Sequence, residues 1–364
     1  MKKKIGILTD DDFSNQHQPP YPRPTFFAYE SPLRISSIMS YLNTLDIFNN
    51  ECIIKLSPKL IDESILKLAH SQYHIDLIKR LSESGHGILG EDIFITQDSY
   101  SLAKKAVGGA IEAVESVIDR KVDQSFALIR PPGHHAVKDN ASGLCIFNNI
   151  ANSILYLREK KKYKKKIAII DIDDHFGDGI ARYFYDDPDV LYFSIHEFDF
   201  LEGDLGYYTE LGEGDGLGKN INFPIPVNTT DKDFLEFMKI LKPIFTEFNP
   251  DLIICAIGFD MHFADQIGNC LLTSKSYYRF TRQILELSEE ICDGKLAFIL
   301  EGGYNLIALP ICVNAVIRSL LNEEFSLSKF EDNKYFLKFD NKRKITKIKN
   351  DLKDLLKKYW DCLE

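Results

Sequence analysis

Short apolar runs alternate with longer amphipathic segments along most of the chain. The short runs are rich in β-branched residues and predict strands at Ile5–Leu8, Phe126–Ile129, Ile167–Ile172, Val190–Ile195, Ile221–Phe223, Leu252–Ala256 and Leu296–Leu300. The longer segments have apolar residues at helical spacing and predict helices near Pro32–Leu45, Glu63–Ser84, Ser99–Ile118, Asn148–Lys162, Asp231–Phe248, Ser274–Cys292 and Leu306–Leu321. This alternation predicts an α/β fold, in which helices cover both faces of a mostly parallel sheet.

A change in composition near the carboxyl end predicts the domain organisation. Residues 1–325 are expected to form one domain, since α/β folds of this length often do so. Residues 326–364 are rich in lysine and end in Leu-Lys-Lys-Tyr-Trp-Asp-Cys-Leu-Glu. We expect this extension to contain an amphipathic helix packed on the main domain; a partner-binding element is the alternative.

The charge and cysteine content exclude several classes of protein. A formal net charge of −10 over 364 residues argues against general nucleic-acid binding. No apolar stretch approaches the roughly 20 residues that span a bilayer, and the apolar run after the basic start is too short for a secretory signal. The seven cysteines are scattered without a disulfide or zinc-finger spacing, which favours a reducing cytoplasm. Export into another cell without a cleavable signal also fits this sequence.

Three candidate metal ligands follow two of the predicted strands. Asp173 and His175 have the spacing D-x-H, which directs both side chains to the same side of an extended segment. Asp260 follows the strand at Leu252–Ala256, where it could instead cap a helix. Two carboxylates and one imidazole suit a divalent first-row metal, and three protein ligands leave a position open for water or substrate. The pattern therefore predicts a catalytic metal site.

Two further motifs supply groups for proton transfer and for stabilising negative charge. His134 and His135 lie in a loop that prolines and a glycine make rigid, and Asp171 and Asp178 could each orient one imidazole. After the strand at Leu296–Leu300, Gly302 and Gly303 let the backbone approach a ligand and leave the hydroxyl of Tyr304 able to donate to a developing oxyanion.

Seven ordered motifs together resemble the histone deacetylase superfamily, which includes acetoin-utilisation proteins and acetylpolyamine amidohydrolases. The resemblance covers roughly residues 26–321 and rests on the segments at 30–34, 130–136, 143–149, 171–179, 194–196, 258–260 and 301–304. It implies an arginase-like three-layer α/β/α fold and one zinc ion per chain, with a structural monovalent cation near Asp171 as a further expectation. The implied reaction is zinc-dependent hydrolysis of the acetyl amide of acetyl-lysine in proteins, including histones.

The resemblance implies a role for each matching residue. Asp173, His175 and Asp260 would bind zinc. His134 and His135 would form two dyads with Asp171 and Asp178, with His135 as the main general base and acid. Tyr304 would polarise the acetyl carbonyl. The residues expected to contact substrate or product are Gly143, Leu144 and Gly303 along the acyl-lysine tunnel and its neighbouring loop, Asp92 at its rim, and Arg34 in an internal channel for acetate exit.

The sequence departs from the family pattern at positions that bear on the substrate. Leu144 stands where a tunnel phenylalanine is usual, and Phe176 replaces a common second histidine. The loop at residues 197–206 lacks the usual Pro-Gly-Thr-Gly, so either Phe198 or Phe200 would supply the other aromatic wall. Four acidic residues in or beside this loop would favour a cationic substrate, or they are solvated loop charges; they are Glu197, Asp199, Glu202 and Asp204.

Three alternatives to a protein deacetylase remain. Acetylated polyamines or other small amides would use the same chemistry, although no long insertion narrows the entrance between residues 80 and 98. An arginase-like ureohydrolase with two manganese ions would need an aspartate where this chain has His262. A non-catalytic scaffold would not need the ligands, histidines and tyrosine that the chain retains. The oligomeric state and the acyl preference are left open.

Overall fold

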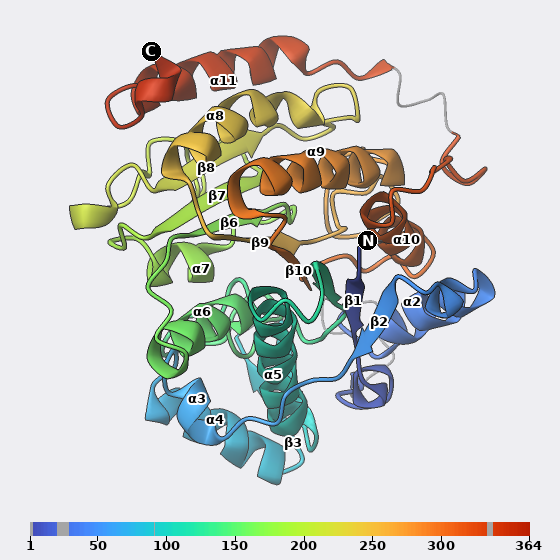
Figure 1. The fold of residues 1–364 in the computed structure, drawn as a ribbon. Coiled ribbons are helices and arrows are strands. Elements are labelled where there is room, and N and C mark those ends of the chain that lie inside the picture. Colours follow the sequence, from blue (N-terminus) through green and yellow to red (C-terminus); the bar gives the residue numbers. More distant parts are fainter. Residues whose placement is uncertain (1–2, 20–28, 91, 333–337) are drawn as a thin grey trace. The chain divides into compact units, whose positions relative to one another are not determined.

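The computed structural model describes residues 3–19, 29–90, 92–332 and 338–364 (Figure 1). The chain divides into two compact units. The first unit comprises Met1–Lys164, Gly177–Tyr183 and Ala297–Leu306, and the second comprises Lys165–Phe176, Phe184–Leu296 and Ile307–Glu364. Each unit contains mostly parallel strands.

The strands of the first unit follow the order β2-β1-β5-β10. Strand β1 pairs in parallel with both neighbours, so that Ile5 lies opposite Ile53 on one side and Gln124 on the other. The four strands are β1 (Ile5–Leu8), β2 (Ile53–Leu56), β5 (Gln124–Ala127) and β10 (Leu296–Leu300). A separate antiparallel hairpin consists of β3 (His86–Leu89) and β4 (Ile93–Thr96).

Helix α5 (Ser99–Ile118) is the most buried helix of the first unit and contacts β1, β5 and α6. It approaches a neighbouring segment closely at Gly108, where a Cβ atom would lie 2.1 Å from the carbonyl oxygen of Lys59. The other helices of this unit are α2 (Leu33–Thr44), α3 (Glu63–Leu66), α4 (Gln72–Glu83), α6 (Asn149–Lys160) and α7 (Asp178–Tyr183), with short 3-10 helices at η1 (Asp11–Ser14) and η2 (Ile47–Asn49).

The second unit has four parallel strands in the order β9-β6-β7-β8. They are β6 (Ile167–Asp171), β7 (Val190–Glu197), β8 (Asn220–Ile225) and β9 (Leu252–Ile257). Every residue of these four strands is buried except the last residue of β7. This burial is expected for strands that are covered on both faces. The helices of this unit are α8 (Met238–Phe248), α9 (Ser274–Cys292), α10 (Ala308–Leu320) and α11 (Lys342–Leu356), with 3-10 helices η3 (Gly214–Gly216), η4 (Phe234–Phe237) and η6 (Asp361–Leu363).

The lysine-rich carboxyl segment contains α11, which contacts β8 and η4. Its apolar face buries Ile345, Ile348, Leu352 and Leu356. Beyond the helix, the indole nitrogen of Trp360 donates a hydrogen bond to the carbonyl oxygen of Gly218 at 2.9 Å. These contacts attach the segment to the second unit, while the domain boundary at residue 325 stays a prediction.

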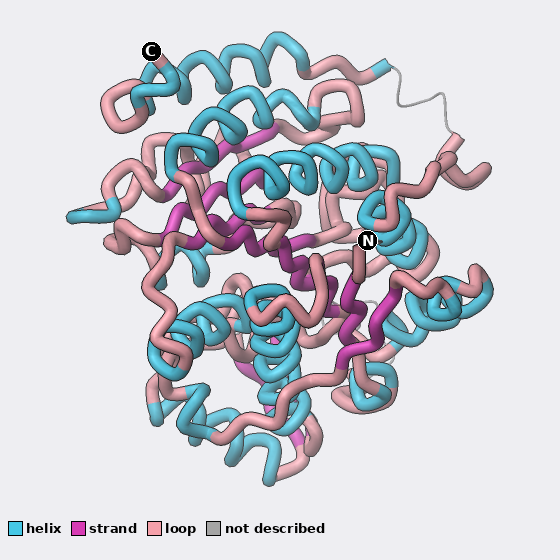
Figure 2. Tube along the Cα trace, viewed as in Figure 1, coloured by secondary structure: helices cyan, strands magenta, loops and turns pink. Residues whose placement is uncertain are grey.

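The α/β fold class and the mostly parallel sheet are confirmed, and Figure 2 shows where strands, helices and loops alternate along the chain. The single helix predicted at Glu63–Ser84 was wrong: the segment divides into α3 and α4, because the Ser71 hydroxyl accepts from the His74 amide and starts a new helix. Strand β5 begins two residues earlier than predicted, and β2, β3 and β4 were missed. Within the described residues, no helix is long and apolar enough to cross a membrane.

Candidate metal centre and catalytic residues

The three predicted metal ligands lie together in the second unit. Asp173 and His175 follow β6, and Asp260 follows β9, which pairs with β6 in parallel. Because the carboxyl ends of paired parallel strands meet at one edge of a sheet, residues distant in sequence become neighbours there. One ligand atom from each residue lies within 4.8 Å of the others.

The donor set of this cluster fits a divalent cation. The Nδ1 atom of His175 lies 3.2 Å from an oxygen of Asp173 and 3.3 Å from Oδ2 of Asp260. That Oδ2 atom is buried, and the His175 ring faces it. The Asp173 carboxylate fits beside residue 258 only because that residue is glycine. A Cβ atom there would lie 2.1 Å from Asp173 Oδ2. Buried carboxylates of this kind are stabilised by a bound metal ion.

The surroundings raise the pKa values of two groups in this cluster, Asp260 and His175. Burial, followed by the charge of Asp173, raises the pKa of Asp260 to about 7. Burial alone would lower the pKa of His175, but hydrogen bonds with Asp173 and Asp260 raise it well above its ordinary value. Since metal ligands must be deprotonated, protons and a metal ion would compete for these atoms.

Backbone and side-chain hydrogen bonds hold this cluster in place. Asp171 accepts from the amide of Asp173 at 3.2 Å and from the hydroxyl of Tyr192 at 2.9 Å. The amide of Asp174 donates to Asp260 Oδ1 at 3.0 Å. Sequence reasoning missed Tyr192, because a tyrosine inside a buried strand has no local feature that marks a hydrogen bond to Asp171. The predicted dyad between Asp171 and His134 stays a prediction.

The histidine pair belongs to the first unit. The rings of His134 and His135 have centroids 4.0 Å apart, and His135 Nδ1 lies 2.9 Å from Asp178 Oδ1. Burial raises the pKa of Asp178, but the hydrogen bond and charge of His135 outweigh it, so the net shift is downward. Helix α7 starts at Asp178, and a Cβ atom at Gly179 would lie 2.6 Å from His134 O. The glycine thus allows Asp178 to approach His135.

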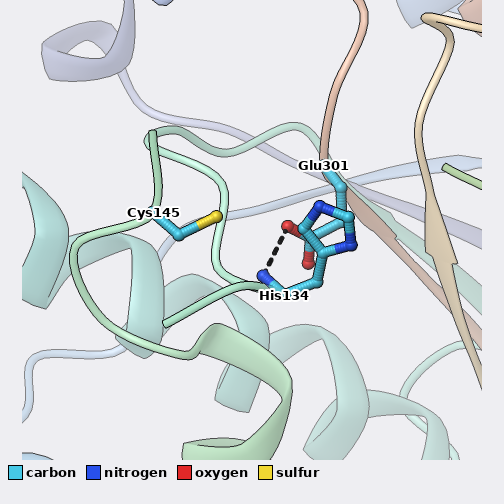
Figure 3. A group of neighbouring side chains, drawn as sticks. All are labelled: His134, Cys145 and Glu301. Carbon is cyan, nitrogen blue, oxygen red and sulfur yellow. Dashed lines mark hydrogen bonds between the residues drawn. The ribbon is translucent and has the colours of Figure 1, made fainter. Parts of the chain in front are cut away.

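The loop after β10 is joined both to the histidine loop and to α2. One carboxylate oxygen of Glu301 accepts from the amides of Gly133 at 2.6 Å and His134 at 3.1 Å, and Figure 3 shows the latter bond. Arg34 on α2 donates to the carbonyl oxygens of Glu301 and of Gly303, the latter at 2.8 Å. Its guanidinium carbon lies 4.7 Å from the ring centroid of Tyr304. Arg34 therefore positions the Tyr304 loop in this structure, while its expected role in acetate exit is untested.

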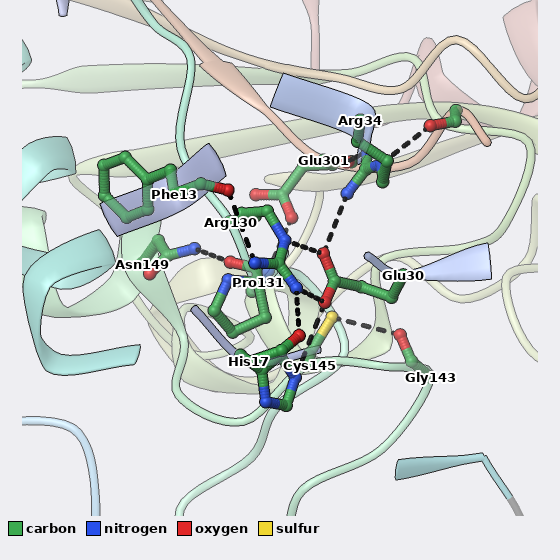
Figure 4. A network of polar contacts seen from close by, with 12 residues as sticks. Phe13, His17, Glu30, Arg34, Arg130, Pro131, Gly143, Cys145, Asn149 and Glu301 are labelled. Atoms are coloured by element: carbon green, nitrogen blue, oxygen red, sulfur yellow. Dashed lines mark hydrogen bonds and ion pairs between the residues drawn. The ribbon is translucent and has the colours of Figure 1, made fainter. Parts of the chain in front are cut away.

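The buried ion pair between Glu30 and Arg130 lies next to Arg34 (Figure 4). Glu30 accepts two hydrogen bonds from Arg130, each at 2.7 Å, and also lies 3.5 Å from Arg34. Arg130 also donates to the carbonyl oxygens of Gln16 and His17. Burial raises the pKa of Glu30, but the charge of Arg130 makes the net shift downward. Both partners stand in the segments that carried the family resemblance, yet sequence reasoning assigned neither a role.

The predicted tunnel residues Gly143 and Leu144 form a left-handed turn beside the histidine pair. Their φ angles are +52° and +66°, and a Cβ atom at residue 143 would lie 2.1 Å from the His135 ring. Glycine is therefore required at 143 on both conformational and steric grounds. The following segment is held by two histidines that sequence reasoning missed: the His70 ring accepts from the Asn148 amide, and His74 Nε2 lies 2.9 Å from Ile146 O.

The remaining tunnel and rim predictions stay open. Asp92 lies in the turn between β3 and β4, and its rim role is untested. Phe198 is buried against Phe200 and Tyr207, whereas Phe200 is 42% exposed. Phe176 packs against His196, with the two ring centroids 4.9 Å apart.

The loop at 197–206 uses several of its polar groups locally. His196 is buried, with Nδ1 2.8 Å from the Ser194 hydroxyl and Nε2 2.9 Å from the carbonyl oxygen of Gly206. Asp199 accepts from the amides of Leu201 and Glu202, and these bonds lower its pKa. The Asp199 carboxylate thus stabilises a turn within this loop.

Position 262 is the one at which an arginase-like ureohydrolase would need an aspartate. In this chain His262 makes a buried contact with a glutamate. His262 Nε2 lies 3.2 Å from Glu331, and both side chains are buried. Glu331 also accepts from the amide and the hydroxyl of Ser274. This contact ties the segment after α10 to the start of α9.

Comparisons with known proteins agree with the arrangement of these motifs. The family model of the histone deacetylase domain matches residues 28–320. A probable deacetylase of Archaeoglobus fulgidus is 33% identical over 370 residues, which cover 99% of each chain. Histone deacetylase HDA1 of Candida albicans is 39% identical over 72% of this chain but 32% of its own length. Polyamine deacetylase HDAC10 of Danio rerio is 36% identical over 72% of this chain and 40% of its own.

The fold also matches a solved structure. The crystal structure of the HD domain of HDA15 superposes with a TM-score of 0.84 at 28% identity, covering 100% of this chain and 97% of that one. The chain thus spans nearly the whole of the probable deacetylase of Archaeoglobus fulgidus and of the HDA15 HD domain, but less than half of the Candida and Danio proteins.

Proposed function

Because the chain belongs to the histone deacetylase family, we propose that it is a zinc-dependent hydrolase that removes the acetyl group from acetyl-lysine in proteins or peptides. The observation that carries this proposal is the gathering of Asp173, His175 and Asp260, a donor set suited to a catalytic metal ion. The same sequence retains the His135–Asp178 pair and Tyr304, which supply the other groups that amide hydrolysis requires.

We propose that Asp173, His175 and Asp260 hold one zinc ion, which lowers the pKa of water and polarises the amide carbonyl when it is bound. His135 then takes a proton at Nε2, because its Nδ1 atom faces Asp178. The proton returns from the same nitrogen to the leaving lysine amine. Asp178 stabilises the protonated imidazole, and His134, whose ring lies beside that of His135, contributes electrostatically.

Tyr304 would donate its hydroxyl hydrogen to the carbonyl oxygen as negative charge develops there. Arg34 supports this role, because it binds the carbonyl oxygen of Gly303 and lies against the Tyr304 ring. Loss of one such donor typically costs about 10²–10³ in rate. Gly143 and Leu144 would line the acyl-lysine tunnel, Gly303 would also contact the substrate, and Asp92 would hold the substrate backbone at the tunnel rim.

Acetylated polyamines are the second candidate substrates, and the similarity to one relative favours them. One relative is named a polyamine deacetylase, with 36% identity over 72% of this chain. The net charge of −10 also attracts cations of either kind. The match to histone deacetylases over a similar share of the chain supports the protein substrate equally.

The test is turnover of a panel containing acetyl-lysine peptides, longer acyl-lysines and acetylated polyamines, with metal content measured on the same sample. We expect release of acetate from peptides that depends on zinc and falls at least about a hundredfold in Tyr304→Phe. Asp260→Asn should lose the metal ion of the Asp173–His175–Asp260 centre and, with it, the activity. Activity confined to polyamines would replace the protein substrate, and full inactivity of zinc-loaded protein on every substrate would overturn the proposal.

A further inference from the structure

A second cluster of ligand-type side chains lies in the second unit beside the candidate metal centre. It contains Asp174, Glu197 and Cys270, and one donor atom of each lies within 4.8 Å of the others. Asp174 is 3% exposed and Cys270 is 1% exposed. None of these three residues has a role in the proposed reaction.

The backbone fixes the three residues from three separate segments. Asp174 follows β6, and its carbonyl oxygen accepts from the amide of Glu197 at the end of β7 at 2.9 Å. The carboxylate of Glu197 accepts from the amide and the side chain of Asn269, at 3.1 Å and 3.0 Å. Cys270 is the next residue, so the bonds that orient Glu197 also place the thiol. Sites built on such anchored elements are held more precisely than sites on free loops.

The side chain of Asp174 provides an independent sign of a missing ligand. Among the described residues, its Oδ1 atom is buried and has no hydrogen-bond partner. The chain also makes room for this carboxylate, since a Cβ atom at Gly268 would lie 2.9 Å from Asp174 Cγ and Oδ2. A buried carboxylate oxygen without a partner carries a desolvation cost that a bound cation would offset.

The charges around the cluster also favour a cation. Within the described part of the chain, no ion pair joins Asp174 or Glu197 to a lysine or an arginine. The donors of Glu197 are the neutral groups of Asn269, which orient the carboxylate without cancelling its charge. Asp174 and Glu197 repel each other in a buried setting, whereas the charge of the neighbouring His175 attracts Asp174. Glu197 is partly exposed, which leaves an approach for an ion from solvent.

We propose that Asp174, Glu197 and Cys270 form a second metal site, separate from the Asp173–His175–Asp260 centre, that binds a thiophilic divalent cation such as Zn²⁺. The sulfur donor favours zinc or cobalt over magnesium or calcium, which prefer sites made only of oxygen. Binding releases the thiol proton to solvent and forms a metal–thiolate bond, while the carboxylates supply two oxygen ligands. The ion would join the ends of β6 and β7 to the segment that follows Asp260.

The site can be tested with Co²⁺, because a cobalt–thiolate bond gives a charge-transfer absorption that oxygen and nitrogen ligands do not produce. The titration uses full-length, metal-depleted protein in which the exposed Cys362 and the half-buried Cys52 are replaced by serine. We expect two equivalents of Co²⁺ to bind, one of which produces the band. Asp260→Asn should lose one equivalent and keep the band, whereas Cys270→Ser should lose the band and keep the other equivalent.

Cys145 provides the matched control, because it is the other cysteine among the described residues that lies within a ligand-type cluster. Cys145→Ser should keep the band. If Cys270→Ser fails to fold, Glu197→Gln serves instead: it should weaken the band-forming site at least about tenfold, since even loss of a partner outside the ligand shell costs that much. Absence of the band in the starting protein, or its survival in Cys270→Ser, overturns the proposal. Failure of catalysis is distinguishable, because it appears in the deacetylation assay and not in this titration.

Discussion

Replacing Arg34 by lysine should impair catalysis through Tyr304. The arginine donates to the carbonyl oxygens of Glu301 and Gly303, and it lies 4.7 Å from the Tyr304 ring centroid. Lysine retains the positive charge but cannot make the two separate bonds of the planar guanidinium group or stack on the ring in the same way. The Tyr304 loop would then keep its fold but lose its exact orientation.

The structure sets bounds on both effects of Arg34→Lys. A hydrogen bond from a charged donor contributes about 1.5–3 kcal/mol, so loss of one of the two should lower the free energy of unfolding by about that amount. Complete loss of the Tyr304 hydroxyl would cost about 10²–10³ in rate, and this is the ceiling for any residue that acts only through it. We expect kcat to fall by roughly tenfold to a hundredfold, below that ceiling.

The decisive assay is a double-mutant cycle with Tyr304→Phe, measured by deacetylation kinetics and urea unfolding. If Arg34 acts by positioning the hydroxyl, Arg34→Lys should have little further effect on kcat in the Tyr304→Phe background. Arg282→Lys, at an exposed ion pair, serves as the control and should change stability by less than about 1 kcal/mol. Equal and independent losses in both backgrounds would refute the positioning role and support the acetate channel instead.

Three further predictions concern the histidine dyad, a buried carboxylate and the carboxyl segment. Asp178→Asn should reduce kcat by about a hundredfold or more with little change in KM, because it removes the charge that orients and stabilises His135; an unchanged pH–rate profile would contradict this. The pKa of Glu331 is lowered from 4.5 to about 2, although burial opposes the shift, because it accepts hydrogen bonds from His262 and Ser274. The ionised Glu331 carboxylate therefore stabilises the folded state by about 3 kcal/mol above pH about 4.5, and this stabilisation is lost as the pH falls through about 2. In urea unfolding, the free energies of unfolding of Glu331→Gln and the parent protein should thus differ less at pH 3 than at pH 7. Trp360→Ala should lower the unfolding free energy by about 3–5 kcal/mol, since the ring is 2% exposed; an unchanged Tm would show that the carboxyl segment is not part of the folded unit.

Local patterns were sufficient for elements with strong periodicity and failed where contacts decide. The buried strands β6, β7 and β9 have continuous apolar runs, and the structure contains all three. Strand β2 is only four residues long and includes a lysine, so its pairing with β1 had no clear signal in the sequence. The division of residues 63–84 into two helices depends on the cap at Ser71, which a helical spacing of apolar residues conceals.

By itself, the sequence determined the α/β alternation and placed Asp173, His175 and Asp260 after strands, because strand and helix periods and the D-x-H spacing are local properties of the chain. Only the tertiary structure decided which distant groups meet. It attached Arg34 to the loop of Tyr304, and it brought Cys270 to Asp174 across 96 positions of the sequence. The physical reason is that strand pairing and burial bring such groups together, and a buried polar atom must then find its partner among whatever the fold places beside it.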